Sequence, residues 1–162
     1  VAVGGTNLVF TMGALLVIDH FGRRKLMIAG SIGYIVSLAA TAFAFYQYGT
    51  TFSSFGSMMV LVSLLVFIAS HALGQGVVIW VFLSEIFPNR VRARGQALGS
   101  FTHWFFAALI SWTFPVVAEI SGGHVFAFYS VMMILQWIWV VRVLPETRGV
   151  PLEEIQKRLG IE

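Results

Sequence analysis

Hydrophobic residues fall into five long runs, separated by short stretches that hold most of the polar and charged positions. The runs cover residues 1–18, 26–46, 58–87, 96–117 and 125–143. A helix needs about 20 mostly apolar residues to cross the hydrocarbon core of a bilayer. The pattern predicts an all-α integral membrane protein: five transmembrane helices form a partial bundle over residues 1–144, and a polar tail over residues 145–162 carries a short amphipathic helix at about 152–159.

The third run is longer than a bilayer requires. Its 30 residues would make a helix of about 45 Å, so it must tilt, kink or break. Gly74 and Gly76 mark the expected break. An interrupted helix at this depth is tolerated where it lines protein or a water-filled site, as in the binding sites of transporters. Close packing of small residues is the alternative explanation for the two glycines.

Composition supports a membrane protein and narrows its chemistry. Of the 162 residues, 58% are hydrophobic and 10% are charged, against about 25% charged residues in soluble domains. The sequence has no cysteine, which excludes disulfides and thiolate metal sites within it. It begins inside an apolar run without a charged segment before it, so we expect no signal peptide and a piece of a longer protein.

The basic residues indicate orientation. All ten lysines and arginines lie in three places: residues 23–25, residues 90–94 and residues 142–158. With five spans, these three places share one side of the membrane, and the positive-inside rule makes that side the cytoplasm. We therefore expect a multi-pass protein of the plasma (inner) membrane with a cytoplasmic C-terminus. Because the basic residues gather on one side of the membrane, the net charge of +3 does not require a nucleic-acid partner.

Three polar residues on different runs lie near the middle of the bilayer. Counted at about 1.5 Å per residue from the polar stretches, Asn7, Gln75 and His103 have a common depth, and His71 shares a helical face with Gln75. Polar groups at this depth are costly unless they face a cavity or a partner. The spacing favours a shared polar cavity, and hydrogen bonds to neighbouring helices are the alternative.

Two tryptophans add to this picture. Trp80 follows the glycine break and offers an apolar ring face with one N–H donor, which suits stacking on a sugar while donating to a hydroxyl group. Trp104, next to His103, has the same properties. Ordinary packing aromatics are the alternative in both cases.

Charged residues at the cytoplasmic edge form a second group. Asp19 and Glu85 lie near the ends of two runs, at the level of Arg23, Arg24 and Arg92. Ion pairs between helices are expected here, because a carboxylate at this level would not be left unpaired, and losing one partner of such a pair is costly. They could hold one conformation and release it in another. A solvated belt of charges at the membrane edge is the alternative.

Together these motifs resemble the sugar porter family of the major facilitator superfamily. The resemblance covers nearly the whole chain and rests on Asp19-x-x-Gly22-Arg23-Arg24-Lys25, Trp80-x-x-x-Ser84-Glu85-Ile86-Phe87-Pro88, Arg92, and the tail motif Pro145-Glu146-Thr147-Arg148-Gly149. It implies helices eight to twelve of a twelve-helix transporter, the C-terminal part of a bacterial-type sugar transporter whose N-terminal half lies outside this sequence.

The resemblance also implies residue roles. Asn7, Gly76, Trp80 and Trp104 match sugar-binding positions, and the cytoplasmic salt-bridge network of the outward-facing state matches Asp19, Arg23, Arg24, Glu85 and Arg92. His103 stands where glucose and xylose transporters usually have Asn or Gln. We add His103 and Gln75 to the expected substrate-binding residues because of their depth.

The resulting hypothesis is transport of a monosaccharide, a hexose or a pentose, by alternating access in a longer secondary transporter. We expect a lipid bilayer and a sugar as partners, and neither a cofactor nor a metal; a coupling proton or cation is left open. A membrane enzyme using His71 and His103 is disfavoured, because no acidic residue shares their depth. A non-transporting sugar sensor or receptor on the same fold is the main alternative.

Overall fold

The computed structural model describes residues 2–49 and 51–160, and the regular structure in these two ranges is helical. In chain order the helices are α1 (Ala2–Phe21), α2 (Arg23–Tyr48), α3 (Ser54–Leu73), α4 (Gln75–Ile86), α5 (Arg92–Ile120), α6 (Gly122–Arg142) and α7 (Leu152–Leu159). Five helical stretches are long and apolar enough to cross a membrane, with α3 and α4 forming one of them. The prediction of an all-α membrane protein with five spans is confirmed.

Several helices extend beyond the apolar runs that predicted them. The second run was expected to begin at residue 26, but α2 begins at Arg23; the fourth was expected over 96–117, but α5 covers Arg92–Ile120. Apolar patterning marks the part of a helix suited to lipid, whereas backbone hydrogen bonding continues into polar residues at either end. Consequently Arg92 and Arg94 belong to the first turn of α5 rather than to a loop, and Glu119 belongs to its last.

The long third run breaks at Gly74, between α3 and α4. A Cβ atom at Gly74 would lie 2.9 Å from the Cα atom of Gly30 on α2, closer than packed atoms allow. The interruption spans one residue, and hydrogen bonds of 3.0 Å on either side join Gly74 to the carbonyl of Ser70 and the N–H of Val78. Both explanations of this glycine, a helix break and close helix packing, therefore apply at the same point.

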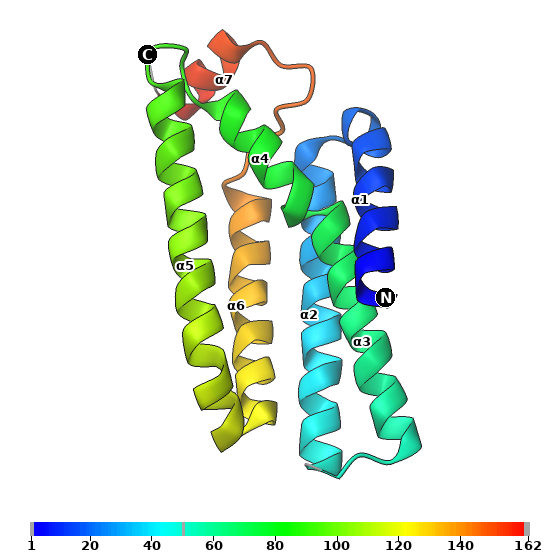
Figure 1. The fold of residues 1–162 in the computed structure, drawn as a ribbon. Coiled ribbons are helices and arrows are strands. Elements are labelled where there is room, and N and C mark those ends of the chain that lie inside the picture. Colours follow the sequence, from blue (N-terminus) through cyan, green and yellow to red (C-terminus); the bar gives the residue numbers. More distant parts are fainter. Residues whose placement is uncertain (1, 50, 161–162) are drawn as a thin grey trace.

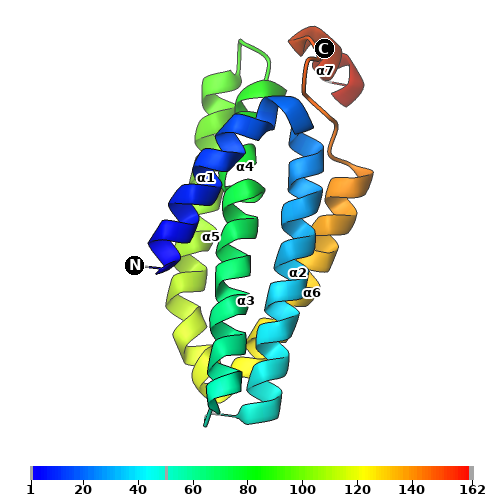
Figure 2. The same ribbon diagram turned by 90° about the vertical axis from the view of Figure 1, so that its right-hand side faces the viewer.

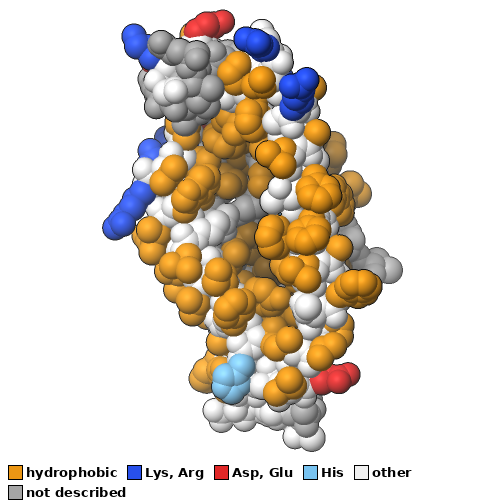
Figure 3. All heavy atoms as spheres, turned by 90° about the vertical axis from the view of Figure 1, so that its left-hand side faces the viewer, with side chains coloured by type: hydrophobic (Ala, Val, Ile, Leu, Met, Phe, Trp, Pro, Cys, Tyr) orange, Lys and Arg blue, Asp and Glu red, His pale blue; other side chains and the backbone are white. Residues whose placement is uncertain are grey.

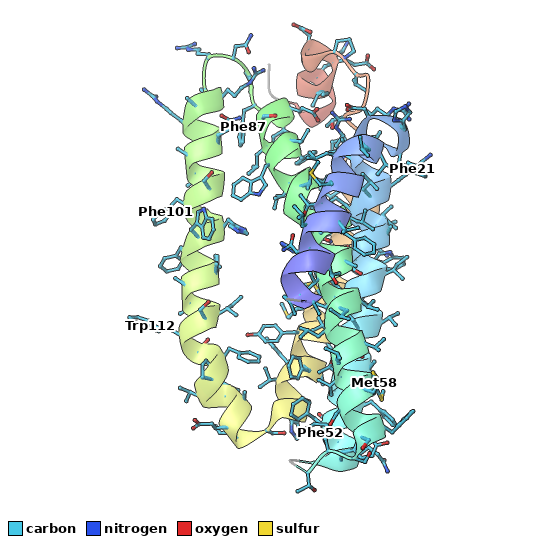
Figure 4. The ribbon with its side chains drawn as sticks, turned by 45° about the vertical axis from the view of Figure 1, so that its right-hand side comes forward. Phe21, Phe52, Met58, Phe87, Phe101 and Trp112 are labelled. Carbon is cyan, nitrogen blue, oxygen red and sulfur yellow. The ribbon has the colours of Figure 1, made fainter. Side chains whose placement is uncertain are left out.

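Helix α2 lies at the centre of the bundle, between α3 and α6 (Figure 1). Helix α1 crosses α3 at an angle (Figure 2). Helix α5 contacts α4 and α6, and none of its 29 described residues is buried. Its outward aromatic side chains include Trp112, which is 85% exposed (Figure 4). Hydrophobic side chains cover the middle of the face in Figure 3, a surface suited to lipid or to further transmembrane helices.

One end of the bundle collects the charged segments. The turn between α1 and α2, the connection from α4 to α5, and α7 lie together at this end (Figure 1). The Lys and Arg side chains visible in Figure 3 also lie in the upper half of that face. Beneath them, a buried cluster joins α1, α2, α4 and α6, and its members are Ile18, Leu26, Met27, Val78, Val140 and Leu144. This core fixes the positions of the helix ends that carry the charges.

Candidate functional site

A cavity of about 580 Å³ opens at the level of the α3–α4 break. Residues from α2, α3, α4, α5 and α6 line it. Its polar lining consists of Tyr34, His71, Gln75, Trp80, His103, Tyr129 and Gln136, and its apolar lining includes Phe67, Phe114 and Phe126. A cavity of this size, mostly apolar with a few polar groups, has the character of a site for a small organic molecule.

Four of the expected substrate-binding residues meet in this cavity: Gln75, Gly76, Trp80 and His103. Trp80 on α4 and His103 on α5 contact each other edge to face, with ring centroids 5.1 Å apart and an interplanar angle of 74°. The two rings therefore join the walls formed by α4 and α5. Counting depth along the sequence correctly placed Gln75 and His103 in one cavity.

Two amide oxygens in the cavity wall are buried without a hydrogen-bond partner among the described residues: Oε1 of Gln75 and Oε1 of Gln136. The amide nitrogen of Gln75 is held by α2, donating to Oγ of Ser31 at 3.0 Å and to the carbonyl of Met27 at 3.4 Å. Most buried polar groups in proteins have a partner. Both oxygens are closed off from solvent, and Oε1 of Gln75 packs against Gly30 on α2, where an added Cβ atom would lie 2.6 Å from it. A ligand in the cavity therefore reaches either acceptor only after the amide side chain turns toward it.

Asn7 and Trp104 do not line this cavity, and the expectation that Asn7 shares it with Gln75 and His103 is corrected. Asn7 is exposed on α1, where its Oδ1 accepts a 2.9 Å hydrogen bond from Thr11. Helix α1 packs on α3, and none of its described residues lines the cavity. Trp104 is 64% exposed and does not line the cavity, although its ring contacts that of His103 with centroids 5.2 Å apart. Their roles in sugar binding stay predictions.

Several residues that line the cavity were not predicted from the sequence as substrate-binding residues. Tyr34, Gln136 and Tyr129 were not proposed, and His71 was considered only for its helical face shared with Gln75 and for a disfavoured enzyme. The signal for Gln136 was available, since it is a polar residue within an otherwise apolar span. Tyr34 and Tyr129 gave no such signal, because aromatic residues are common in membrane helices on any face.

The second site is a hydrogen-bonded cluster at the charged end. Arg23, whose side chain is 11% exposed, joins two carboxylates: Nη1 lies 2.9 Å from Oδ1 of Asp19, and Nη2 lies 2.8 Å from Oε1 of Glu85. The Asp19 side chain is 75% exposed and that of Glu85 is 26% exposed. The link from α2 to the end of α4 is therefore the better shielded of the two.

Arg24 and Arg92 form no ion pair with any described side chain, which corrects the expectation for these two residues. The guanidinium group of Arg24 donates instead to the carbonyl of Val141. Nε of Arg92 donates to the carbonyl of Phe87 at 3.3 Å. Both arginines satisfy the exposed carbonyl groups near a helix end, a common role for basic residues there.

The tail motif Pro145–Gly149 docks onto this cluster. Glu146 accepts hydrogen bonds from the backbone N–H groups of Arg23 at 2.9 Å and Arg24 at 3.2 Å, so its carboxylate caps the N-terminus of α2. The hydroxyl of Thr147, which is 4% exposed, donates to Oε2 of Glu85 at 2.6 Å. Gly22, with φ of +89°, leaves room for Glu146, since a Cβ there would lie 2.5 Å from Oε2.

The remaining motif residues shape the turn that positions these contacts. Gly149 has φ of +66°, and the N–H of Val150 donates to the carbonyl of Thr147 at 3.3 Å, which makes a tight turn with glycine at its third position. Arg148 donates through its guanidinium group to the carbonyl of His20 at the end of α1. The motif thus joins the ends of α1, α2 and α4.

Comparison with known proteins agrees with this architecture. The model of the family "Sugar (and other) transporter" matches residues 1–159. The D-xylose-proton symporter of Escherichia coli K12 is 34% identical over 163 residues, covering 96% of this chain and 32% of the symporter. The glucose transporter GlcP of Staphylococcus epidermidis is 33% identical over 160 residues, covering 98% of this chain and 35% of the transporter.

A solved structure of the E. coli proton:xylose symporter XylE, bound to 6-bromo-6-deoxy-D-glucose, superposes with a TM-score of 0.84 at 33% identity, covering 96% of this chain and 33% of that one. The chain thus spans about a third of the length of these relatives. Its place within them, which the motifs predict to be helices eight to twelve, stays a prediction. These relatives are transporters, not enzymes, and the chain belongs to the sugar porter family of the major facilitator superfamily.

Proposed function

We propose that this chain forms one wall of the binding cavity of a secondary transporter, which moves a monosaccharide across the membrane by alternating access. The observation that carries the proposal is the cavity itself, in which Trp80 and His103 contact each other and the polar residues His71, Gln75 and Gln136 lie among aromatic rings. A sugar offers hydroxyl groups to such polar side chains and C–H faces to such rings. Relatives named for xylose and glucose support the same class of substrate.

The charged cluster serves the conformational cycle in this proposal. Arg23, Glu85 and Thr147 connect α2, α4 and the tail through contacts of 2.8 Å and 2.6 Å. Such contacts stabilise the conformation in which they form, and they are lost when the helix ends separate. We call Arg23, Glu85, Glu146 and Thr147 the latch. Its side of the membrane is the cytoplasm if the positive-inside rule holds for the complete protein.

Uptake of labelled hexoses and pentoses tests the proposal, measured in cells or vesicles with the complete protein at its natural length. We expect Gln136→Leu, which keeps the side-chain volume, to weaken transport of the preferred sugar about three- to tenfold through one lost hydrogen bond. Trp80→Ala should weaken it more. Trp112→Ala is the matched control, since Trp112 is 85% exposed on α5 and does not line the cavity.

Each result has a distinct meaning. Unchanged uptake and sugar binding in both cavity variants would refute the site. Sugar binding without uptake in the unaltered protein would favour a sensor or receptor instead of a transporter. Repeating the uptake with a proton uncoupler separates proton symport, which the uncoupler abolishes, from facilitated diffusion, which it leaves unchanged.

A further inference from the structure

His71 occupies a distinctive position in the cavity wall. It lies in the last turn of α3, next to the break at Gly74, and its Nδ1 atom is within hydrogen-bond distance of the hydroxyl of Tyr34 on α2. Tyr34 is 6% exposed, and its ring packs on Phe67 with centroids 4.8 Å apart. The hydroxyl is therefore held in place, and it in turn fixes the orientation of the imidazole ring.

The other ring nitrogen of His71 faces the space above Gly76. A Cβ atom at Gly76 would lie 3.0 Å from Nε2 of His71 and 2.9 Å from its carbonyl oxygen. Glycine thus keeps open the room beside Nε2, and both residues line the cavity. No hydrogen-bond partner of Nε2 occurs among the described residues.

The contact with Tyr34 also determines which nitrogen carries the proton. A phenolic hydroxyl is more acidic than a neutral imidazole N–H group, so Tyr34 donates and Nδ1 accepts. The neutral ring then holds its proton on Nε2 and presents a donor to the cavity. A sugar hydroxyl that enters the cavity beside Gly76 can accept a hydrogen bond from this N–H group.

We propose that His71 is a specificity-determining residue, whose Nε2–H group donates a hydrogen bond to one particular hydroxyl of the sugar, and that Tyr34 is its positioning residue. The inference rests on the proposed function and assigns it a pair of residues that lie outside the family motifs in this sequence. No Asp, Glu, Lys or Arg is among the described residues that line the cavity. On this wall of the cavity, discrimination between hydroxyl groups therefore depends on neutral donors and acceptors such as this pair.

The test compares the preferred sugar with its monodeoxy analogues, each lacking one hydroxyl, in the complete protein. In the unaltered protein, one analogue should bind about three- to tenfold more weakly than the parent because of the lost contact. His71→Phe keeps a ring of similar size. It should lower the affinity for the parent sugar to that of the analogue, and it should leave the affinity for the same analogue unchanged. His71→Gln, which retains an N–H donor, should restore part of the preference.

Tyr34→Phe should reduce the same preference about two- to threefold, and should have no further effect in the His71→Phe background because it acts through His71. Tyr46→Phe and His124→Phe are matched controls: these two rings also contact edge to face, with centroids 5.3 Å apart, but they do not line the cavity. The controls should leave every sugar affinity within about twofold.

The outcomes separate the inference from the proposed function. If the unaltered protein binds or transports sugars but His71→Phe weakens the parent and all analogues equally, His71 is a packing residue and the inference is overturned. The same holds if His71→Phe changes nothing. If the unaltered protein neither binds nor transports any hexose or pentose, the proposed function fails, and this inference fails with it.

Discussion

Removing the charge of Glu85 should open the latch. Its carboxylate receives Nη2 of Arg23 at 2.8 Å and the hydroxyl of Thr147 at 2.6 Å. Glu85→Gln keeps the shape and one acceptor oxygen but leaves the guanidinium, 11% exposed, without its shielded partner. A hydrogen bond to a charged group contributes about 1.5–3 kcal/mol. A loss of about 2 kcal/mol corresponds to a shift of about thirtyfold toward conformations in which the contact is absent.

A single introduced cysteine can report this shift in a complete protein whose cysteines outside this chain, if there are any, have been replaced; the chain itself contains none. Ile155 on α7 is 3% exposed and borders the same hollow as Glu85 and Thr147. A thiol introduced by Ile155→Cys should react slowly with a membrane-impermeant maleimide while the latch is closed. With Glu85→Gln added, we expect the labelling rate to rise at least tenfold, in line with the thirtyfold shift.

Asp19 supplies the control for this experiment, because it pairs with the same guanidinium at 2.9 Å but is 75% exposed. Exposed ion pairs contribute about 0.2–1 kcal/mol, so Asp19→Asn should change the labelling rate by less than about fivefold. Equal effects of the two substitutions would show that labelling responds to net charge rather than to the buried contact. A labelling rate within twofold of the starting value for Glu85→Gln would refute the latch.

Two further predictions concern stability, measured as the thermal unfolding midpoint of the purified complete protein. Gly76→Ala should destabilise the protein by about 1–3 kcal/mol, because the added carbon meets the His71 carbonyl, which cannot move freely. Gly13→Ala is the control: nothing lies within 4 Å of its added carbon, so it should be neutral or stabilising. Equal effects of the two substitutions would contradict the packing argument. Glu146→Gln should cost about 0.3–2 kcal/mol, because the N-terminus of α2 loses a negative charge, and an unchanged midpoint would contradict the capping role.

Depth in the membrane could be predicted from the sequence, whereas rotation about each helix axis could not. Gln75, Gly76 and His103 share a cavity because they lie at a similar depth and also on helix faces that point toward one another. For Asn7 only the depth was known, and the packing of α1 on α3 turns it elsewhere. The rotation of a helix depends on which of its residues meet a neighbouring helix, as Gly30 and Gly74 do. A hydrophobic run with small residues on several sides does not determine which side makes that contact.

The charged cluster shows a similar division. The residue types and their common level predicted that Asp19, Arg23 and Glu85 would meet. The contacts of Glu146 with backbone N–H groups could not be predicted this way. They depend on where a tail more than 120 residues away in the sequence returns to the bundle. Opposite charges in a sequence suggest which side chains form ion pairs. A carboxylate that caps a helix binds backbone N–H groups instead, so no charged side chain in the sequence points to it.

Helix α4 connects the cavity with the latch. Its first residues, Gln75 and Gly76, line the cavity, and Glu85, its penultimate residue, holds Arg23 and Thr147. Twelve residues of helix span about 18 Å, and a hydrogen-bonded helix of this length moves largely as a rigid rod. Val78, fully buried near its start, fixes it to the core. A ligand that tilts α4 about this anchor would therefore displace the carboxylate at the other end, where contacts of 2.8 Å and 2.6 Å tolerate little movement. Under the proposed function, this geometry would give sugar binding a direct mechanical route to the latch, because one helix carries residues of both.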